Sequence, residues 1–327
     1  MARSVLFIGG TGVISSACVE RARDQGWQVS VLNRGRGSRP LPDGVEPLVA
    51  DIRDRDSVTA ALQGRSFDAV CEFVGFLPDH VTSDIELFTG RTGQYVFISS
   101  ASAYQTPAAR LPITEATPLR NPYWKYSRNK IACEDALVRA YREDGFPVTI
   151  VRPSHTYDRT LSPLDGGATM LRRLVEGREV VVHGDGSSLW TLTHNTDFAK
   201  GLVGLLGLPA AVGGAFHITN DDWLTWDAIV RMLAAAVGSE PRIVHVPSDA
   251  IAAADPQWGA GLLGDKANSS IFDNSLIRSL VPDFVCTTSF AQGAREIIEW
   301  HTAEESRLVP DPEREALIER LVAAHRV

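Results

Sequence analysis

The chain has 327 residues, 44% of them hydrophobic and 22% charged, which is the composition of a globular protein with one large domain or two unequal ones. Its net charge of −8 argues against a broad basic surface for nucleic acid, and no apolar run reaches the roughly 18 residues that span a membrane. The 4 cysteines are scattered without a CxxC pair and no signal peptide is recognisable, so we expect a cytoplasmic protein without disulfides or a structural metal.

Short apolar runs alternate with helix-like segments over the first half of the chain. The expected strands are residues 5–9, 29–32, 45–50, 67–71, 95–98 and 148–151. The expected helices are residues 13–25, 56–62, 81–88 and 126–142. Strands that are apolar on both faces and alternate with helices predict an α/β fold with a doubly wound parallel Rossmann sheet.

The alternation loosens after about residue 155, where glycines and prolines punctuate shorter elements. We therefore predict a nucleotide-binding domain over residues 1–160 and a smaller C-terminal substrate-binding domain over 161–327. A segment at about 193–220, helical near its start, is expected to return to the first domain. The stretch 311–327 is expected to form an amphipathic terminal helix.

A glycine-rich turn lies between the first expected strand and the first expected helix. Glycines there let the backbone turn tightly and approach a pyrophosphate at the helix N-terminus. Ser15 stands at the third glycine of G-x-G-x-x-G, and its side chain is small enough for close packing. The other interpretation is a glycine turn without a ligand. The cofactor-binding residues predicted in this turn are Gly9, Thr11, Gly12, Val13 and Ile14.

The end of the second strand bears on the choice of cofactor. An acidic residue there would hold the ribose 2′-OH of NAD, whereas an arginine accommodates the 2′-phosphate of NADP. The chain has Asn33 and Arg34 at this point, which favours NADP(H), with NAD(H) as the alternative and a solvated basic loop as the non-functional interpretation. Asp51 and Ile52 end the third strand, where the carboxylate either accepts from the adenine amino group or caps the next turn.

A tyrosine and a lysine, Tyr126 and Lys130, stand four residues apart and share a helix face. A nearby ammonium favours phenolate, so we expect a lowered pKa for Tyr126 and proton exchange with a substrate oxygen. Upstream, Ser99 and Ser100 follow a strand at the edge where α/β sheets place their sites. A surface aromatic–cation pair on an amphipathic helix is the alternative.

These motifs resemble the extended short-chain dehydrogenase/reductase superfamily, and in particular its NAD-dependent epimerase/dehydratase group, over nearly the whole chain. The resemblance implies that Ser100, Tyr126 and Lys130 are catalytic and that Lys130 also holds the nicotinamide ribose. It implies that Pro153 and His155 lie against the cofactor, His155 where asparagine is usual. The substrate-binding residues predicted with it are Ser102, Tyr157 and Trp190.

Three departures from the family pattern mark an atypical member. Trp190 replaces an arginine that commonly grips a nucleotide-sugar diphosphate, although a tryptophan is as often part of the core. Ala101 and Ser102 replace the acids typical of sugar 4,6-dehydratases, and Glu72 replaces a common histidine. The segment at Glu72 looks more like the branch near plastid RNA-binding relatives.

The expected function is hydride transfer between a nicotinamide and a secondary alcohol or ketone carbon of a sugar-like small molecule, with an NADPH-dependent reductase favoured. A sugar epimerase that oxidises and re-reduces one carbon with bound NAD is the alternative within the same class. A non-catalytic, cofactor-bound or RNA-binding relative is the alternative from another class. We expect no metal, nucleic-acid or membrane partner, and assembly as a homodimer stays open.

Overall fold

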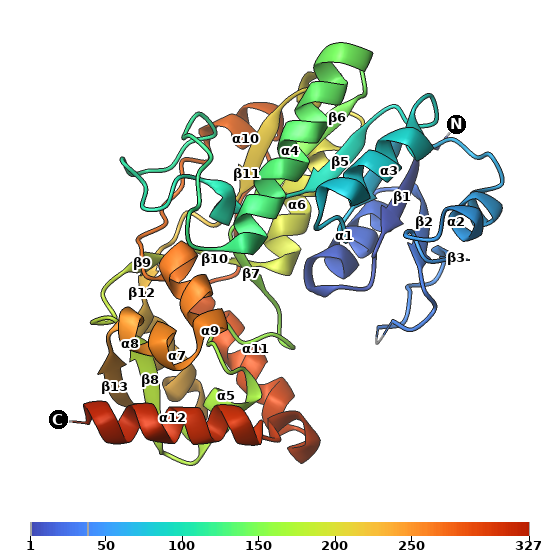
Figure 1. Cartoon of the computed structure of the whole chain (residues 1–327). Coiled ribbons are helices and arrows are strands. Elements are labelled where there is room, and N and C mark those ends of the chain that lie inside the picture. Colours follow the sequence, from blue (N-terminus) through green and yellow to red (C-terminus); the bar gives the residue numbers. More distant parts are fainter. Residues whose placement is uncertain (1, 38, 327) are drawn as a thin grey trace.

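A computed structural model describes residues 2–37 and 39–326, and Figure 1 shows a sheet flanked by helices beside a second group of elements. The sheet has seven strands, all parallel, in the order β11-β6-β5-β4-β1-β2-β3. Its strands are β1 (Ser4–Ile8), β2 (Gln28–Asn33), β3 (Glu46–Val49), β4 (Ala69–Glu72), β5 (Tyr95–Ile98), β6 (Val148–Pro153) and β11 (Ala215–Ile218). The order reverses between β1 and β4, which confirms the doubly wound Rossmann sheet and places the binding crevice at that point.

Helices cover both faces of the sheet, as expected for strands such as β4 and β5 that are buried throughout. The helices on one face are α1 (Val13–Asp24) and α6 (Asn195–Leu205), which pack together. The helices on the other face are α2 (Arg55–Leu62), α3 (Pro78–Phe88) and α4 (Lys125–Asp144). The helix α10 (Ser275–Leu280) also packs under the α1 and α6 face through Ile277, so a late part of the chain belongs to this core.

The second group of elements has a separate hydrophobic core. Its helices are α5 (Ala168–Val175), α7 (Trp226–Val237), α8 (Ser248–Ala254), α9 (Pro256–Gly261), α11 (Phe290–Thr302) and α12 (Pro312–His325). They surround a parallel pair of strands, β8 (Glu179–His183) and β13 (Arg242–Val246). The remaining turns are η1 (Ala101–Ala103), η2 (Pro209–Ala211), the π-helical η3 (Leu262–Lys266) and η4 (Glu305–Leu308).

Two small strand pairs lie where the chain passes between the sheet and this second core. The pair β7 (His155–Tyr157) and β10 (Leu192–His194) is parallel, whereas β9 (Leu189–Trp190) and β12 (Leu224–Thr225) are antiparallel. Since β7 follows directly on β6, it continues from the carboxyl edge of the main sheet. Among the described residues, no helix combines the length and apolar character needed to cross a bilayer.

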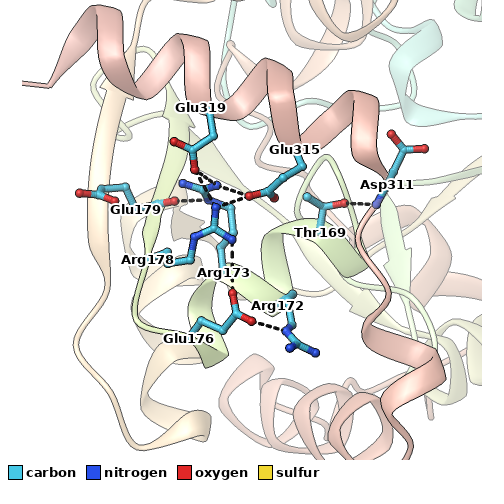
Figure 2. Close-up of polar contacts among 9 residues, drawn as sticks. All are labelled: Thr169, Arg172, Arg173, Glu176, Arg178, Glu179, Asp311, Glu315 and Glu319. Carbon is cyan, nitrogen blue, oxygen red and sulfur yellow. Dashed lines mark hydrogen bonds and ion pairs between the residues drawn. The ribbon is translucent and has the colours of Figure 1, made fainter.

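The terminal helix α12 is held by a buried arginine, Arg173 of α5 (Figure 2). The Nη1 of Arg173 donates to Glu315 Oε1 at 2.7 Å and to Glu319 Oε1 at 2.6 Å, and its Nε donates to the carbonyl oxygen of Glu179. The backbone N–H of Asp311 donates to Thr169 Oγ1 at 2.9 Å. A buried guanidinium needs such partners, so α12 is an integral part of the second core.

Candidate active site

A cleft of about 310 Å³ opens at the carboxyl ends of β1, β5 and β6, beside the start of α4. The predicted residues that line it are Gly9, Gly12, Val13, Ile14, Ser100, Tyr126, Lys130 and Pro153. The other residues that line it are Ser15, Phe73, Val74, Phe76, Ile98, Ser99, Ser154 and Thr156. The glycine turn and the serine, tyrosine and lysine therefore face one cleft although they are far apart in the sequence.

The glycine turn is shaped for a ligand that approaches the backbone. Gly9 has φ of +83°, and a Cβ on it would lie 2.6 Å from Val74 Cγ1, so only glycine fits there. Ser15 braces the turn, because its Oγ donates to the Gly9 carbonyl oxygen at 2.7 Å and accepts from the Gly12 N–H at 2.8 Å. The helix α1 begins directly behind Gly12, and its N-terminus can receive a pyrophosphate. These features fit a dinucleotide.

Thr11 does not line the cleft but lies under the loop that follows β2. A Cβ on Gly37 would lie 2.8 Å from Thr11 Oγ1, so the loop crosses directly over the glycine turn. In the same loop the guanidinium of Arg39 forms an ion pair with Asp158 Oδ2 at 2.6 Å and donates to Ser16 Oγ at 3.0 Å. The loop after β2 therefore packs against the glycine turn and the start of α1.

The residues predicted to contact the adenine half lie at the ends of β2 and β3, outside the cleft described above. Asn33 Oδ1 accepts from the Gly35 N–H at 2.8 Å, while the side chain of Arg34 is exposed. Asp51 Oδ1 accepts from the Arg53 N–H at 3.0 Å, so this carboxylate does cap the following turn. Ile52 is buried. Their contact with a cofactor stays a prediction.

Lys130 is almost wholly buried, and its ammonium is fixed by two carbonyl oxygens. It donates to Gly75 O at 2.8 Å and to Ile98 O at 2.7 Å, and the rings of Phe76 and Phe97 lie 4.8 Å away. An ammonium has three N–H bonds, so one is left for a ligand in the cleft. Burial lowers the pKa of Lys130 to about 8.

The pKa of Tyr126 moves in the direction opposite to the expectation from the sequence. Burial raises it to about 12, although the Ser100 hydroxyl acts to lower it. The reason is geometric: Lys130 Nζ lies 5.8 Å from the centre of the Tyr126 ring and donates to two carbonyl oxygens. Lys130 therefore does not lower this pKa, the loss of hydration outweighs the Ser100 hydrogen bond, and the phenol is protonated at neutral pH.

The other predicted residues lie behind the cleft or in the second core. His155 Nδ1 accepts from Trp190 Nε1 at 3.3 Å, and burial lowers the pKa of His155 to about 3. Trp190 packs against Trp226 in the second core, and Tyr157 is buried edge-on to Phe290. None of these side chains lines the cleft, so their contact with cofactor or substrate stays a prediction.

The sequence analysis missed a buried acidic pair beside the cleft, Glu72 of β4 and Asp84 of α3. Burial, and then the neighbouring Asp84 charge, raises the pKa of Glu72 well above its usual range. Burial also raises the pKa of Asp84, which accepts from Tyr95 Oη at 2.7 Å, and the guanidinium of Arg53 lies 3.9 Å from both carboxylates. The position of Glu72 at the end of an apolar strand could have indicated a buried carboxylate. Nothing in the sequence around Asp84 indicates that it pairs with Glu72.

No cluster of three or more metal-ligating side chains occurs within residues 2–37 and 39–326. The polar groups that face the cleft are instead hydroxyls, one phenol and one ammonium. Such a set can orient a dinucleotide and exchange a proton with an oxygen of a second ligand.

Comparison with known proteins agrees with this geometry. The chain is 26% identical over 285 residues to a 2′-dehydrokanamycin reductase of Streptomyces kanamyceticus, which covers 86% of this chain and 79% of that protein. It is 26% identical over 260 residues to the chloroplast stem-loop binding protein of 41 kDa b of Arabidopsis thaliana. That match covers 74% of this chain and 66% of that protein. Among solved structures it is similar to the epimerase Mth375 of Methanothermobacter thermautotrophicus, with a TM-score of 0.76, 16% identity and 94% coverage of both chains.

The family model of the NAD dependent epimerase/dehydratase family matches residues 5–218. This range holds the seven strands of the sheet, the glycine turn and the catalytic candidates. The match places the chain in the NAD dependent epimerase/dehydratase family.

Proposed function

We propose that this protein is an NADP(H)-dependent reductase that converts a ketone of a sugar-like small molecule into a secondary alcohol. The observation that carries the proposal is that Ser100, Tyr126 and Lys130 face the same cleft as the glycine turn. When bound, the nicotinamide supplies the hydride that is added to the carbonyl carbon. The glycine turn and the N-terminus of α1 would hold its pyrophosphate, and Lys130 its ribose.

Tyr126 is the proton donor in this proposal. A ketone that receives a hydride develops negative charge on its oxygen and takes up a proton from a neighbouring acid. Burial raises the pKa of Tyr126 to about 12, so the phenol carries its proton at neutral pH and is in the form that reduction requires. Ser100 donates a second hydrogen bond to the same oxygen and stabilises the developing charge.

The loop after β2 supports the preference for NADP(H). Arg34 and Arg36 are exposed there, and among the described residues neither forms an ion pair. Asn33 stands in place of the acidic residue that selects the free ribose hydroxyl. Two unpaired guanidinium groups at this point suit a 2′-phosphate.

Two other functions, a sugar epimerase and a non-catalytic RNA-binding protein, each have one observation in their favour. A sugar epimerase acting with bound NAD uses the same three residues, and the family to which the chain belongs includes epimerases. The similarity to a chloroplast stem-loop binding protein supports a cofactor-bound, RNA-binding relative. The net charge of −8 and the complete set of Ser100, Tyr126 and Lys130 favour the enzyme.

The substrate in this proposal is sugar-like but carries no nucleotide. Trp190 is buried against Trp226 and cannot replace the arginine that grips a diphosphate in related proteins. The similarity to a 2′-dehydrokanamycin reductase makes keto-aminoglycosides the first compounds to try. We expect free UDP and dTDP to bind weakly in calorimetry, and a low-micromolar Kd for either would restore a nucleotide-sugar substrate.

The experiment is NADPH oxidation with a panel of keto-sugars, 2′-dehydrokanamycin included. We expect turnover with at least one ketone by the wild type, and turnover at least about 10²-fold slower by Tyr126→Phe. Retention of NAD through purification, with interconversion of epimers and no net oxidation of added NADPH, would establish the epimerase instead. A salt-sensitive gel shift with RNA, and no turnover of any compound, would establish the binding protein.

A further inference from the structure

Three serine hydroxyls form a line that ends at the cleft. Ser127, on α4, is fully buried and donates to Ser102 Oγ at 2.8 Å. Ser102, on η1, is also buried, and its Oγ lies 2.8 Å from Ser100 Oγ. Ser100 is partly exposed and lines the cleft beside Tyr126. The line therefore runs from the interior of the protein to the position where a reacting oxygen would sit.

The direction of each hydrogen bond in this line follows from counting the donors and acceptors of the three hydroxyls. A hydroxyl has one hydrogen to donate and two lone pairs that accept. Since Ser127 donates to Ser102, the hydrogen of Ser102 is free to be donated to Ser100. Ser100 Oγ also accepts from the backbone N–H of Ser102 at 3.2 Å. Both lone pairs of Ser100 are then used, and its own hydrogen is left to point into the cleft.

The opposite polarity leaves a hydrogen without an acceptor. If Ser100 donated to Ser102, then Ser102 would accept from both of its neighbours and its own hydrogen would need a third partner. Among the described residues, the only side-chain oxygens that contact Ser102 Oγ are those of Ser100 and Ser127. A buried hydroxyl without an acceptor is costly, so the inward-to-outward polarity is the stable one.

The backbone around this line is fixed by one amide, that of Asn121. Its Nδ2 donates to the carbonyl oxygen of Ser102 at 2.9 Å and to that of Gly264 at 2.6 Å. Its Oδ1 accepts from the backbone N–H of Trp124 at 3.0 Å, immediately before α4. Asn121 is itself buried, so η1, η3 and the start of α4 are held at one point. The serine hydroxyls thus keep their spacing without help from a ligand.

We infer that Ser127 and Ser102 are positioning residues, which orient the Ser100 hydroxyl as a hydrogen-bond donor toward the reacting oxygen and Tyr126. This inference rests on the proposed function for the identity of the reacting oxygen, but the polarity of the line does not. It differs from the prediction that Ser102 contacts the substrate, because the Ser102 hydroxyl lies one hydrogen bond further from the cleft than the Ser100 hydroxyl. The effect of Ser127 on the reaction is therefore transmitted through Ser100.

The ionisation of Tyr126 provides a test that needs no substrate. A phenolate is stabilised by a donated hydrogen bond, so the pKa of residue 126 reports the direction of the Ser100 hydroxyl. We would replace Tyr126 with 3,5-difluorotyrosine, whose ring fluorines lower the pKa of the phenol and so bring its ionisation into a range that can be titrated in the folded protein. The fluorine NMR shift of this single residue would then be followed against pH in the full-length protein.

We expect Ser127→Ala to raise the titration midpoint by up to about 1 pH unit, the net value of one hydrogen bond, because the Ser102 hydroxyl loses the bond that fixes its rotamer and can turn away from Ser100. Ser100→Ala should raise it at least as much, and Ser127→Ala should add nothing in the Ser100→Ala background. Ser127→Thr, which keeps the hydroxyl, should titrate like the wild type. Ser30→Ala is the control, since it removes another buried serine hydroxyl, on β2, that does not line the cleft.

The inference is overturned if Ser127→Ala leaves the midpoint unchanged, or if its shift persists in the Ser100→Ala background. Should Ser127→Ala fail to fold, Ser102→Ala carries the same expectations, because it breaks the line at the next hydroxyl. Since no ketone is involved, a negative result on catalysis does not affect this titration. Conversely, an unshifted midpoint in Ser127→Ala leaves the proposed reduction intact.

Discussion

Glu134 of α4 and Arg152 of β6 form a buried ion pair one helical turn below Lys130. Arg152 Nη2 lies 2.5 Å from Glu134 Oε2, and Arg152 Nε lies 3.0 Å from Oε1. Ser99 at the end of β5 donates to the same carboxylate. The pair therefore joins the helix that carries Tyr126 and Lys130 to two strands of the sheet, and it sets the rotation of that helix.

Removing one member of this pair should destabilise the protein strongly. Glu134→Ala would leave the Arg152 guanidinium buried without its counter-charge, at a cost of about 3–5 kcal/mol in the free energy of unfolding. Chemical denaturation measures this directly. The double variant Glu134→Leu with Arg152→Met should recover much of the loss, because neither charge remains. Equal stability of Glu134→Ala and the wild type would contradict a buried pair.

Tyr126→Phe tests the proton donor. The change removes only the hydroxyl, so folding and cofactor affinity should be retained while single-turnover hydride transfer slows by about 10²–10⁴-fold. Burial raises the pKa of Tyr126 to about 12, so the wild-type reduction rate should show no loss attributable to this group through neutral pH. Wild-type rates in the variant would remove Tyr126 from the mechanism.

The lowered pKa of Lys130 predicts a pH dependence of cofactor affinity. The ammonium form donates to the cofactor, so the affinity for NADPH should weaken as the pH rises above about 8. Lys130→Met should bind more weakly and without this dependence. The affinity would be measured by fluorescence titration at several pH values. If Lys130→Met lost affinity for NADPH with rising pH as the wild type does, another group would be responsible.

The lowered pKa of Lys130 also affects stability: the affinity for NADPH should fall with rising pH, whereas the free energy of unfolding should rise. A lysine whose folded pKa lies below its ordinary value of 10.5 holds its proton less tightly in the folded state than in the unfolded state. Its contribution to the free energy of unfolding should therefore increase between about pH 8 and about pH 10. Lys130→Met should lack this increase.

The acidic pair of Glu72 and Asp84 predicts a loss of stability as the pH rises above the ordinary carboxyl range. Both pKa values are raised by burial, so the folded state holds a proton more tightly than the unfolded one, and stability falls as the pH rises through the raised values. Glu72→Gln keeps the acceptor for the Val74 N–H and removes one titration. Between the ordinary carboxyl range and the raised pKa values, the melting temperature of this variant should vary less with pH than that of the wild type, and parallel curves would contradict the raised pKa of Glu72.

Arg34→Ala tests the choice of cofactor. The variant should lose about 1–3 kcal/mol of binding free energy toward NADPH, the value of a charge-assisted contact, and little toward NADH. Arg55→Ala is a matched control, since it removes an exposed arginine from α2, away from the loop after β2. The hypothesis fails if the wild type binds NADH as tightly as NADPH.

The sheet and its helices could be predicted from the sequence because their residues repeat with clear periods. The helix expected at 126–142 is α4 (Lys125–Asp144), and the strand expected at 95–98 is β5. The glycine turn and the Tyr126–Lys130 pair share the predicted cleft, since strand order in a parallel sheet brings their positions together. Local pattern and topology were sufficient for this part.

The remaining features depend on tertiary contacts that no local pattern encodes. The π-helical η3 is joined to the start of α4 by Asn121, which stands more than one hundred positions earlier in the sequence. Trp190 is a core residue because Trp226 covers it. The pKa of Tyr126 rises because the phenol is buried, and the sequence shows neither this burial nor the two carbonyl oxygens that bind the Lys130 ammonium.

The position of Arg173 also affects how the chain folds during synthesis. Its carboxylate partners, Glu315 and Glu319, are 142 and 146 residues further along the chain (Figure 2). A growing chain that has not yet released residue 319 from the ribosome cannot satisfy this guanidinium. The Rossmann sheet, whose strands end at Ile218, has all its strands much earlier. The two cores are therefore completed at different times, and the second closes only as the last helix emerges.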